Sequence, residues 1–562
     1  MKRANLARTV AVAVLAGAMV AASAAYAAPV KNMVTEKAIS TAGSTTSPMD
    51  GGDTDVYGTK VVYNEMSSAG DYDVYLFDTV SGLSAPIASS EAEDRYPKIY
   101  GDYVAYTRNG STIQLYRIST GKTKQIASST VWNSAVDVYA NKVVYSKYNK
   151  TTKSLDVYAY DIGTGSTKLL VTGKQSDGTY SNDAAIAIYG NNVIYLANSK
   201  DLRACSIKTG KTVSLGVQGL SMNRDPYQVR RNIPAIYQNT VTYVATASGF
   251  DHVFAYDLVT KVRTQVSQDA TIHANPTIDG TRIVYESGSV ADPQLMLYDI
   301  KAKATWTLNV NKAMQPSIWG DRLAWTDLRN AAVDYQYNDY TSWKNEDVYT
   351  GTLDTVRIAI AGPATIAYSA PATYAATVTN PDGSSVGNGT DLGFEVSADG
   401  INWTSLGTGP TASGSVTATL PATPSKRYVR FWYGGKSATP GNPGAVPTVS
   451  GVVTVKPKVS VGTPAAPASV KAKKSFTVTG TLKPKHASGS KPVRVYKYKW
   501  TSGKWKSYGY VKATASNYSG YSRYKVKMSL PSKGTWKLQA KAPADSLHAD
   551  TWSSKYDKVK VK

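Results

Sequence analysis

The sequence predicts an all-β protein in which a β-propeller up to residue 354 is followed by two β-sandwiches. The first observation behind this prediction is a repeat. Seven times between residues 57 and 354, a short strand ends in two apolar residues and an aromatic, at steps of 39 to 50 residues. A unit of this length cannot bury its apolar faces alone, so the units must stack on one another. The repeated strand ends at Tyr63, Tyr106, Tyr145, Tyr195, Tyr243, Tyr285 and Trp325.

The second observation is the content of each unit. A second run of β-branched and aromatic residues follows the first, then a turn, then a short strand that proline often opens, as at Pro97, Pro276 and Pro316. Four short antiparallel strands per unit predict a propeller blade. We expect seven blades, with six as the alternative if the irregular unit at 191–238 is not a full blade.

The two ends of the repeat predict how the ring closes. The last unit ends near Asp354 without its third and fourth strands, whereas residues 34–39 and 55–58 look like a third and a fourth strand with no predecessors. We therefore expect the mature N-terminal segment to complete the last blade. Such closure leaves few free sheet edges.

A family resemblance supports the same fold. The segments Asp73–Asp78 and Gly320–Trp325, together with the proline-opened strands, resemble the propeller repeats of TolB-type proteins and of secreted bacterial and archaeal surface proteins. The resemblance implies a binding platform, with a protein partner on one propeller face, and transfers no chemistry.

The first 27 residues are typical of a signal peptide. Basic residues precede an apolar run from Val10 to Ala25, and Ala25-Tyr26-Ala27 is a small-x-small cleavage pattern. No later run approaches 18 continuous apolar residues, so we expect no transmembrane segment. We take residues 28–354 as the mature propeller and expect a secreted protein that associates with a bacterial cell wall.

Residues 355–455 form the next predicted domain. They are rich in Thr, Ala, Gly and Pro, with short strand-like runs between turn signals. This pattern predicts an immunoglobulin-like or fibronectin-like sandwich. The segment Asp399–Trp403 resembles a hairpin of Ig-like domains in bacterial surface proteins, which implies a spacer.

The last predicted domain, residues 456–562, holds most of the charge. It carries 24 Lys and Arg residues against three acids, so +21 of the chain's net +23 lies there. That asymmetry indicates an anionic partner. Like charges within a Debye length of roughly 8 Å repel one another and disfavour folding unless counter-ions or a polyanion offset them.

Strand alternation places the charges within this domain. From residue 494 to residue 500, it puts Tyr496, Tyr498 and Trp500 on one face and Lys497 and Lys499 on the other. We expect the aromatic face to be core and the opposite face to be a field of lysines, in a second Ig-like β-sandwich.

The segments 482–486, 516–521 and 542–549 resemble repeat domains at the ends of actinobacterial exported proteins and cell-wall hydrolases. This resemblance implies a wall-associated domain whose partner is an anionic wall polymer or glycan, and we expect no nucleic acid. Predicted polymer contacts are Lys497, Lys499, Lys504, Lys506, Lys525 and Lys527, with Trp505, Tyr508 and Tyr510 either stacking on sugars or packing in the core.

No sequence motif indicates an enzyme. The four histidines show no metal-ligand spacing, and no Gly-x-Ser-x-Gly segment occurs, so we predict no catalytic residue, metal or cofactor. Glu65, Glu286 and Asp327 follow the repeated aromatic, and as channel acids they could serve acid/base chemistry. Surface turns are their default interpretation. A noncatalytic surface-binding protein is the first hypothesis, and a propeller polysaccharide lyase or hydrolase held at the wall is the alternative.

Overall fold

Every regular element in the described part of this computed structural model is a β-strand, which confirms the all-β prediction. Among the described residues, no helix is long and apolar enough to cross a membrane. The predicted signal peptide lies outside the described residues. The structure describes residues 34–40, 53–67, 70–128, 135–151, 154–172, 185–197, 201–221, 232–289, 291–310, 312–337, 340–344, 346–381, 383–436 and 445–562.

The described residues up to 353 form seven four-stranded antiparallel sheets. The first sheet contains β2 (Thr54–Tyr57), β3 (Lys60–Met66), β4 (Tyr72–Asp78) and β5 (Leu83–Ala88). The second contains β6 (Asp94–Tyr100), β7 (Tyr103–Arg108), β8 (Thr112–Arg117) and β9 (Lys122–Ser128). The third contains β10 (Val136–Tyr139), β11 (Lys142–Asn149), β12 (Ser154–Asp161) and β13 (Thr167–Val171). The fourth sheet contains β14 (Ile186–Tyr189), β15 (Asn192–Ala197), β16 (Asp201–Ser206) and β17 (Thr212–Ser214). The fifth contains β18 (Ala235–Tyr237), β19 (Thr240–Ala247), β20 (Phe250–Asp257) and β21 (Arg263–Gln265). The sixth contains β22 (His273–Asp279), β23 (Arg282–Ser287), β24 (Gln294–Asp299) and β25 (Ala304–Thr307).

The seventh sheet joins the two ends of this region. Its order is β26 (Ala313–Trp319), β27 (Arg322–Asp327), β30 (Asp347–Leu353) and β1 (Val34–Ala38). The hairpin β28 (Ala332–Tyr337) and β29 (Tyr340–Lys344) is inserted between β27 and β30. Strand β1 runs antiparallel to β30, with Val34 opposite Leu353 and Ala38 opposite Tyr349. A segment near the N-terminus therefore completes the last sheet.

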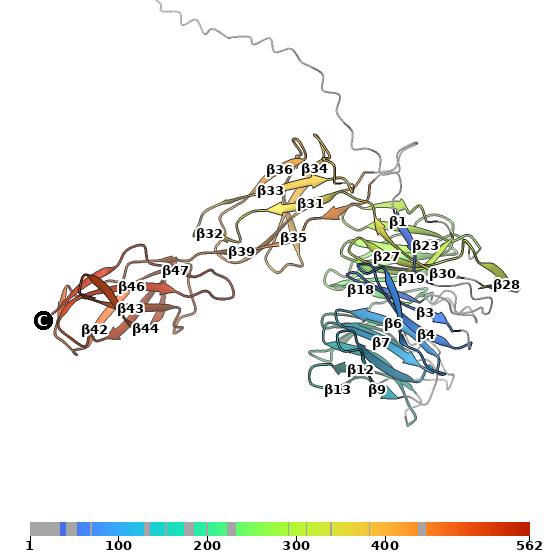
Figure 1. Ribbon diagram of the computed structural model, residues 1–562, viewed down its shortest axis with the longest axis horizontal. Coiled ribbons are helices and arrows are strands. Elements are labelled where there is room, and N and C mark those ends of the chain that lie inside the picture. The colour runs from blue at the N-terminus through green and yellow to red at the C-terminus, as the bar shows by residue number, and fades with distance from the viewer. Residues whose placement is uncertain are drawn as a thin grey trace, which may run out of the picture.

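The sheets form a closed ring. The first strand of each sheet lies against the first strand of the next, and β26 lies against β2. The second strands are covered by neighbouring sheets on both faces, so Val61, Val62 and Tyr63 are all buried in succession instead of alternating. These features define a β-propeller, shown at one end of the molecule in Figure 1.

The predicted assignment of strands to sheets needs one correction. Residues 55–58 do not help to close the last sheet, because β2 pairs with β3 in the first. The proline-opened strand likewise begins each sheet instead of ending the one before. It follows the preceding outer strand directly in sequence, and sequence spacing alone does not show with which neighbour it pairs. Residues 191–238 supply β15, β16, β17 and β18, which belong to two successive sheets.

The second domain packs two sheets around one apolar cluster. One sheet contains β31 (Arg357–Ala361), β33 (Ala372–Thr379) and β36 (Ser415–Leu420). The other contains β32 (Thr365–Ile366), β39 (Val453–Pro457), β37 (Arg427–Tyr433), β34 (Asp391–Ser397) and β35 (Trp403–Pro410), with β38 (Thr448–Val449) beside β37. Strand β39 crosses the predicted boundary at 455, so we define the sandwich as residues 355–457.

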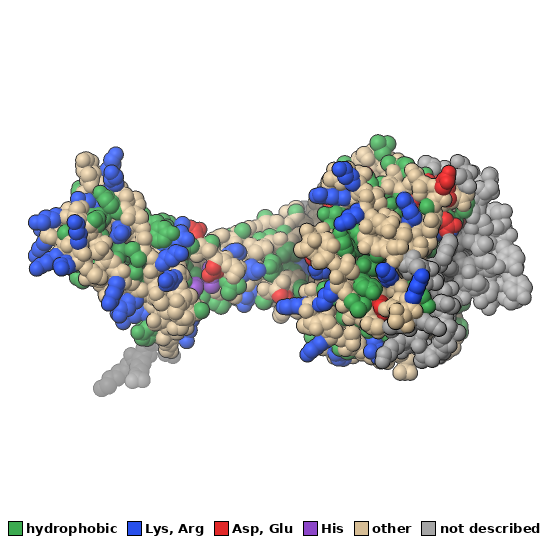
Figure 2. Space-filling model, turned by 90° about the horizontal axis from the view of Figure 1, so that it is seen from below, with side chains coloured by type: hydrophobic (Ala, Val, Ile, Leu, Met, Phe, Trp, Pro, Cys, Tyr) green, Lys and Arg blue, Asp and Glu red, His purple; other side chains and the backbone are tan. Residues whose placement is uncertain are grey.

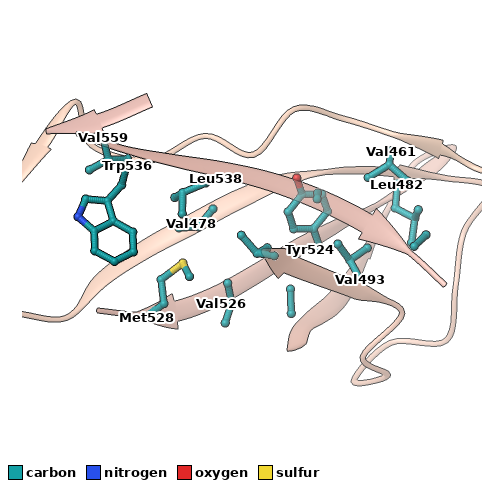
Figure 3. Packing of buried hydrophobic residues seen from close by; sticks show 14 of the residues in the cluster. Val461, Val478, Leu482, Val493, Tyr524, Val526, Met528, Trp536, Leu538 and Val559 are labelled. Atoms are coloured by element: carbon teal, nitrogen blue, oxygen red, sulfur yellow. The ribbon is translucent and has the colours of Figure 1, made fainter. Parts of the chain in front are cut away.

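The C-terminal module, residues 458–562, folds one long sheet around its own core. Strand β44 is long enough to pair with β45 at one end and β43 at the other, which bends the sheet over the core. Tyr524, Met528, Trp536 and Leu538 point into this core (Figure 3). The strand order is β40 (Ser460–Val461), β42 (Phe476–Lys483), β45 (Tyr521–Met528), β44 (Lys504–Tyr518), β43 (Val493–Thr501), β46 (Gly534–Ala542), β48 (Asp557–Val561) and β41 (Ser469–Val470), with β47 (Thr551–Trp552) beside β46.

The three bodies follow one another in space as in sequence, with the C-terminal module farthest from the propeller (Figure 1). The sandwich docks on one face of the propeller. Val446 of the sandwich is fully buried in the propeller cluster that contains Trp306, and the Trp306 Nε1–H donates to Lys436 O at 3.1 Å. Thr355 Oγ1 donates to Val446 O at 2.7 Å.

Candidate binding surfaces

One end of the propeller axis is lined by aromatic rings. The last residue of each first strand occupies this position, and six of the seven are aromatic: Tyr57, Tyr100, Tyr139, Tyr189, Tyr237 and Trp319, with Asp279 as the seventh. Each tyrosine ring leans on the next at a tilt of about 45–50°, and centroids are 4.5 Å apart from Tyr57 to Tyr100 and 4.7 Å from Tyr189 to Tyr237. The Tyr57 and Trp319 centroids are 4.2 Å apart. Burial, together with the neighbouring tyrosines, raises the pKa of Tyr139 to about 12.

A charged layer lies two residues before this aromatic layer on the same strand faces. It contains Asp55, Lys98 and Asp137, whose side chains are half-buried. Asp55 Oδ2 accepts the Ile99 amide and Asp137 Oδ2 accepts the Ile188 amide, each at 2.8 Å, so both carboxylates join neighbouring sheets. Burial raises the pKa of Asp137 to about 7, against the opposing charge of Lys98.

The predicted channel acids differ from one another in their environments. Asp327 is fully buried and accepts hydrogen bonds from Arg329 Nε and Nη2, both at 2.7 Å, and from Trp325 Nε1 at 3.1 Å. Arg329 also binds Glu36 of β1 at 2.6 and 2.8 Å, so Asp327 helps to hold the closing strand.

Glu286 is also fully buried. Its Oε1 accepts Asn275 Nδ2 at 2.6 Å and the Gln315 amide at 2.5 Å, which links two successive sheets. Glu65 is half-buried and lies opposite Asp73 on the neighbouring strand. The surface-turn interpretation is therefore wrong for Glu286 and Asp327, because both lie within strands and serve internal bonding. Alternation in a short strand places a side chain on a face but does not reveal such partners.

The C-terminal module presents aromatic and basic side chains, each exposed or half-buried, together on the outer face of β43, β46 and β48 and the adjoining half of β44. We call this surface the aromatic-basic face. It contains Arg494, Tyr496, Tyr498, Trp500, Trp505, Tyr510, Lys512, Lys537, Lys541, Trp552, Tyr556 and Lys558. Lys and Arg side chains are spread over the visible surface of this module in Figure 2.

Cations and rings are in direct contact on the aromatic-basic face. Lys537 Nζ lies 4.4 Å from the Tyr498 centroid, 5.0 Å from that of Tyr556 and 5.6 Å from that of Trp505. Lys541 Nζ lies 5.2 Å from the Trp552 centroid. Cation–π contacts of this kind hold the ring faces and the ammonium groups in fixed relation at a surface.

Like charges also lie directly opposite one another on this face. Lys537 pairs with Lys558, and Arg494 pairs with Lys512 on one side and Lys541 on the other. Directly opposed like charges destabilise a sheet by a few tenths of a kcal/mol to about 1 kcal/mol each. The acid that offsets this charge is Asp550, whose carboxylate lies 2.7 Å from Lys541 Nζ. A bound polyanion would relieve the remaining repulsion.

The predicted division of β43 into a core face and a lysine face is inverted. Lys497 lies opposite Leu538 and Lys499 opposite Trp536, and both partners are fully buried core residues. Residues directly opposite in a sheet share a face. Lys497 and Lys499 are therefore on the core side, where Lys499 Nζ reaches Ser532 Oγ at 2.9 Å. Tyr496 and Tyr498 lie on the outer face.

The other predicted polymer contacts are distributed over the module. Trp505 and Tyr510 belong to the aromatic-basic face, whereas the Tyr508 ring packs against Trp536 at 4.8 Å. Lys525 and Lys527 are exposed on β45 opposite threonines of β42 and β44. Lys504 and Lys506 are exposed near the start of β44.

Sequence reasoning missed Tyr496, Tyr498, Lys537, Trp552 and Tyr556 as surface residues. It assigned Tyr496 and Tyr498 to the core because they are hydrophobic. The available signal was on β46, where Trp536, Leu538 and Ala540 alternate with Lys537 and Gln539 and identify the buried face. Pairing β43 with β46 would then have placed the tyrosines outside.

Comparisons with known proteins give only distant structural likenesses. No family model and no curated protein matches the chain. Among solved structures, it is similar to the β-propeller domain of the trilobed protease from Pyrococcus furiosus at 9% identity and a TM-score of 0.40, over 55% of this chain and 94% of that one. An oligogalacturonate lyase in complex with manganese shows 11% identity and a TM-score of 0.38, over 57% and 96%.

TolB from Acinetobacter baumannii, a protein of the type that the repeats resemble, matches at 14% identity and a TM-score of 0.30, over 52% of this chain and 80% of that one. All three TM-scores are below 0.5. Such matches say nothing of ligand or activity, and the particular function has to come from the surfaces of this chain.

Proposed function

We propose that the chain is an exported, noncatalytic binding protein of the bacterial cell surface. In this proposal the C-terminal module tethers the protein to an anionic wall polymer or glycan. The Ig-like sandwich is a rigid spacer, and the seven sheets are seven blades that present a binding platform. The observation that carries the proposal is the aromatic-basic face, where opposed cations and exposed rings occur together.

The chemistry of this face favours a polymer that carries both negative charge and sugar rings. Lys537 and Lys558 would share a phosphate or carboxylate between them, since neither has an acid opposite it on the neighbouring strand. Exposed rings such as Trp500 and Trp552 offer flat apolar surfaces beside those cations. Sugar rings can pack against such surfaces while the charged groups of the polymer reach the ammonium groups.

The geometry of the propeller supports a platform for a partner. The sandwich occupies the face formed by turns between first and second strands and between third and fourth strands, which includes Arg282 and Lys301. Antiparallel strands alternate in direction, so the second-to-third turns and the links between sheets form the opposite face. We propose that this opposite face binds a protein partner.

Two charge-matched double variants test the tether. K537Q/K558Q removes two charges from the aromatic-basic face, and K525Q/K527Q removes two charges from the lysine–threonine face of β45. Each Lys near an anionic surface contributes about 1 kcal/mol. We expect the first pair to weaken sedimentation with purified walls roughly thirtyfold, and the second to weaken it less.

Walls stripped of their phosphate polymers and a salt titration complete this test. Binding should fall on stripped walls and decrease as salt rises, because released counter-ions drive attachment to a polyanion. Equal losses for both double variants would show that net charge alone acts, without a particular face. Undiminished binding of K537Q/K558Q, or binding that ignores salt, would contradict the proposal.

The alternative function, a polysaccharide lyase or hydrolase, draws little support from the predicted acids. Glu286 and Asp327 are buried in bonds that hold neighbouring sheets and the closing strand. Incubation with wall glycans and uronates tests it directly. Product release that disappears in Glu65→Gln would favour this alternative over the noncatalytic proposal.

A further inference from the structure

Two histidines and an aspartate meet at the joint between the sandwich and the C-terminal module. His486 follows β42, whereas Asp545 and His548 lie between β46 and β47. Their ligand atoms all lie within 4.8 Å of one another. Asp545 Oδ2 is 3.6 Å from His486 Nε2 and 3.0 Å from His548 Nδ1. Histidine side chains, purple in Figure 2, are visible beside acidic ones at the narrow junction.

Backbone carbonyls fix the orientation of both imidazoles. His486 Nδ1 lies 3.0 Å from Pro484 O, and His548 Nε2 lies 3.0 Å from Pro424 O. A carbonyl oxygen only accepts hydrogen bonds, so each of these ring nitrogens carries a hydrogen. In the neutral imidazole, the other nitrogen then carries a lone pair. Those two lone pairs, on His486 Nε2 and His548 Nδ1, are directed at the same carboxylate.

The carboxylate of Asp545 is held in place as an acceptor. Its Oδ1 accepts the backbone amides of Leu547 and His548, both at 2.7 Å. Backbone amide donors favour the ionised form of a carboxyl group. The carboxylate of Asp545 then faces two nitrogen lone pairs. This arrangement requires a positive species between them, either a proton or a metal ion.

We propose that His486, Asp545 and His548 bind a divalent transition-metal ion, with Zn²⁺ as the best fit. Two imidazole nitrogens and one carboxylate oxygen are a common zinc ligand set, and solvent supplies the fourth position. Bonds of about 2.0–2.1 Å in a tetrahedron place ligand atoms roughly 3.3 Å apart, close to the 3.0 and 3.6 Å found here. The two carbonyls match the hydrogen-bonded outer shell that orients metal-binding histidines.

Differences in exposure give the site an open side. The side chains of His486 and His548 are 12% and 6% exposed, whereas that of Asp545 is 42% exposed. The ion could therefore enter from solvent past Asp545 and retain a water there. Sequence spacing hides this site because His486 is far from the other two ligands in the chain, and only the fold brings them together.

Occupancy of the site would fasten two domains together. Pro424 belongs to the sandwich, and its carbonyl orients His548. The same joint holds a hydrogen bond from the Ala549 amide to Pro457 O at 3.0 Å and one from Lys456 Nζ to Asp545 O at 3.2 Å. A metal ion would thus fix the angle at which the C-terminal module leaves the sandwich.

Zinc binding by the full-length, tag-free protein tests the proposal. After chelator treatment, the protein is titrated with Zn²⁺ at pH 7.5 by calorimetry and by competition with a chromophoric chelator. We expect one Zn²⁺ per chain, and X-ray absorption should show two imidazole nitrogens bound. Loss of a single outer-shell partner weakens metal sites by about 10–100-fold. We therefore expect D545N and H548Q, which remove ligands, to weaken binding by more than about 100-fold.

The control variant is D550N, the same substitution in the same module at an aspartate that pairs with Lys541. It should bind Zn²⁺ as the natural protein does. Circular dichroism of D545N without metal checks that the module still folds. Unchanged Zn²⁺ affinity in D545N would overturn the proposal. An absence of stoichiometric Zn²⁺ binding would overturn it too, and nitrogen NMR shifts showing His548 doubly protonated at pH 7.5 would then identify a proton as the species that bridges the cluster.

Discussion

At the scale of single residues, the propeller axis contains acids whose ionisation opposes folding. Asp137 is half-buried at the propeller axis and joins two sheets through the Ile188 amide. Burial raises its pKa to about 7, although Lys98 partly offsets this effect. Burial also raises the pKa of Asp55 on the other side of Lys98. The protonated form of Asp137 is therefore favoured in the folded chain more than in the unfolded one.

The stability of the propeller should consequently fall as these groups ionise. An acid whose folded pKa is raised contributes stability below its unfolded pKa, and this contribution is lost as pH rises toward the folded value. For Asp137 the window runs from about pH 4 to about pH 7. We predict that D137N gains stability relative to the natural protein across this window, by as much as about 1.4 kcal/mol per pH unit. Thermal unfolding at several pH values measures the difference.

Asp161 provides a control, because its pKa is lowered in the folded chain whereas that of Asp137 is raised. Hydrogen bonds from the Thr164 amide and from Lys142 lower its pKa. Folded and unfolded forms of this carboxyl therefore both titrate at or below about pH 4, near its ordinary value. The stability difference between D161N and the natural protein should stay constant from pH 5 to pH 7.5. A difference for D137N that is equally constant would mean that Asp137 is not perturbed by burial.

At the scale of elements, ring closure depends on how closely β1 approaches β30. Gly351 in β30 lies opposite Glu36 in β1. A Cβ on Gly351 would lie 2.5 Å from Val34 Cγ1 and 3.0 Å from the Trp325 ring. No real Cβ tolerates the first distance, so a side chain here must displace Val34. The glycine allows β1 to cover Trp325.

A double-mutant cycle tests this contact. We predict that G351A destabilises the propeller by roughly 1–3 kcal/mol through overpacking. V34A removes the methyl group that the new Cβ would strike. The double variant G351A/V34A should therefore be more stable than the sum of the single effects by at least about 0.5 kcal/mol. Urea unfolding of the full chain gives all four free energies.

Val104, in the second strand of the second sheet, supplies the additive reference. It is fully buried and belongs to a different apolar cluster from Val34. Effects of G351A and V104A should add within about 0.5 kcal/mol. Additive behaviour of G351A with V34A as well would show that the closing strand does not press on Gly351.

Strands in which apolar and charged residues alternate were predictable from the sequence, as β45 shows. Its Tyr524, Val526 and Met528 are buried, and Lys525 and Lys527 are exposed. The same rule failed on β43, because both of its faces carry long side chains and either could cover a core. Only the register with β46, which places Lys497 opposite Leu538, decides between them.

Contacts between segments that lie far apart in the sequence could not be predicted, and this limited the prediction of the sites as well. The repeat revealed the strands of the propeller, and the incomplete last unit revealed that a segment near the N-terminus closes it. The pairing predicted for residues 55–58 was wrong, because the edges of two adjacent sheets look alike in the sequence. His486 and His548 showed no recognisable spacing, since the fold alone brings them to one carboxylate.

At the scale of the whole molecule, the sandwich and the propeller share a buried ionic contact. Glu395 of β34 is almost fully buried and accepts hydrogen bonds from Lys301 of the propeller and from Arg430 Nε, the latter at 2.8 Å. The Lys301 ammonium lies 3.7 Å from the Trp432 ring centroid. Burial lowers the pKa of Lys301, although Glu395 opposes the shift. Polar contacts thus complement the apolar anchor at Val446.

This contact ties the propeller to the sandwich, as the proposed spacer role requires. We predict that E395Q loosens it, because the glutamine leaves Lys301 and Arg430 without their shared negative charge. Removing one member of a buried ion pair costs about 3–5 kcal/mol. The lower end applies here, since Lys301 is 27% exposed. Small-angle scattering should show a broader range of inter-domain distances, and the melting temperature should fall.

A surface ion pair serves as the control, because it shows whether the loss of any ion pair has the effect expected of E395Q. Asp102 pairs with Arg117 at 2.8 Å where both side chains are solvent-exposed. D102N should change stability by no more than about 1 kcal/mol and leave the scattering curve unchanged. The loss from a broken buried pair comes largely from the charge left uncompensated, so K301M/E395Q, which also removes the Lys301 charge, should recover part of the rigidity that E395Q loses. If E395Q scatters like the natural protein, Val446 and its apolar surroundings alone hold the two domains together.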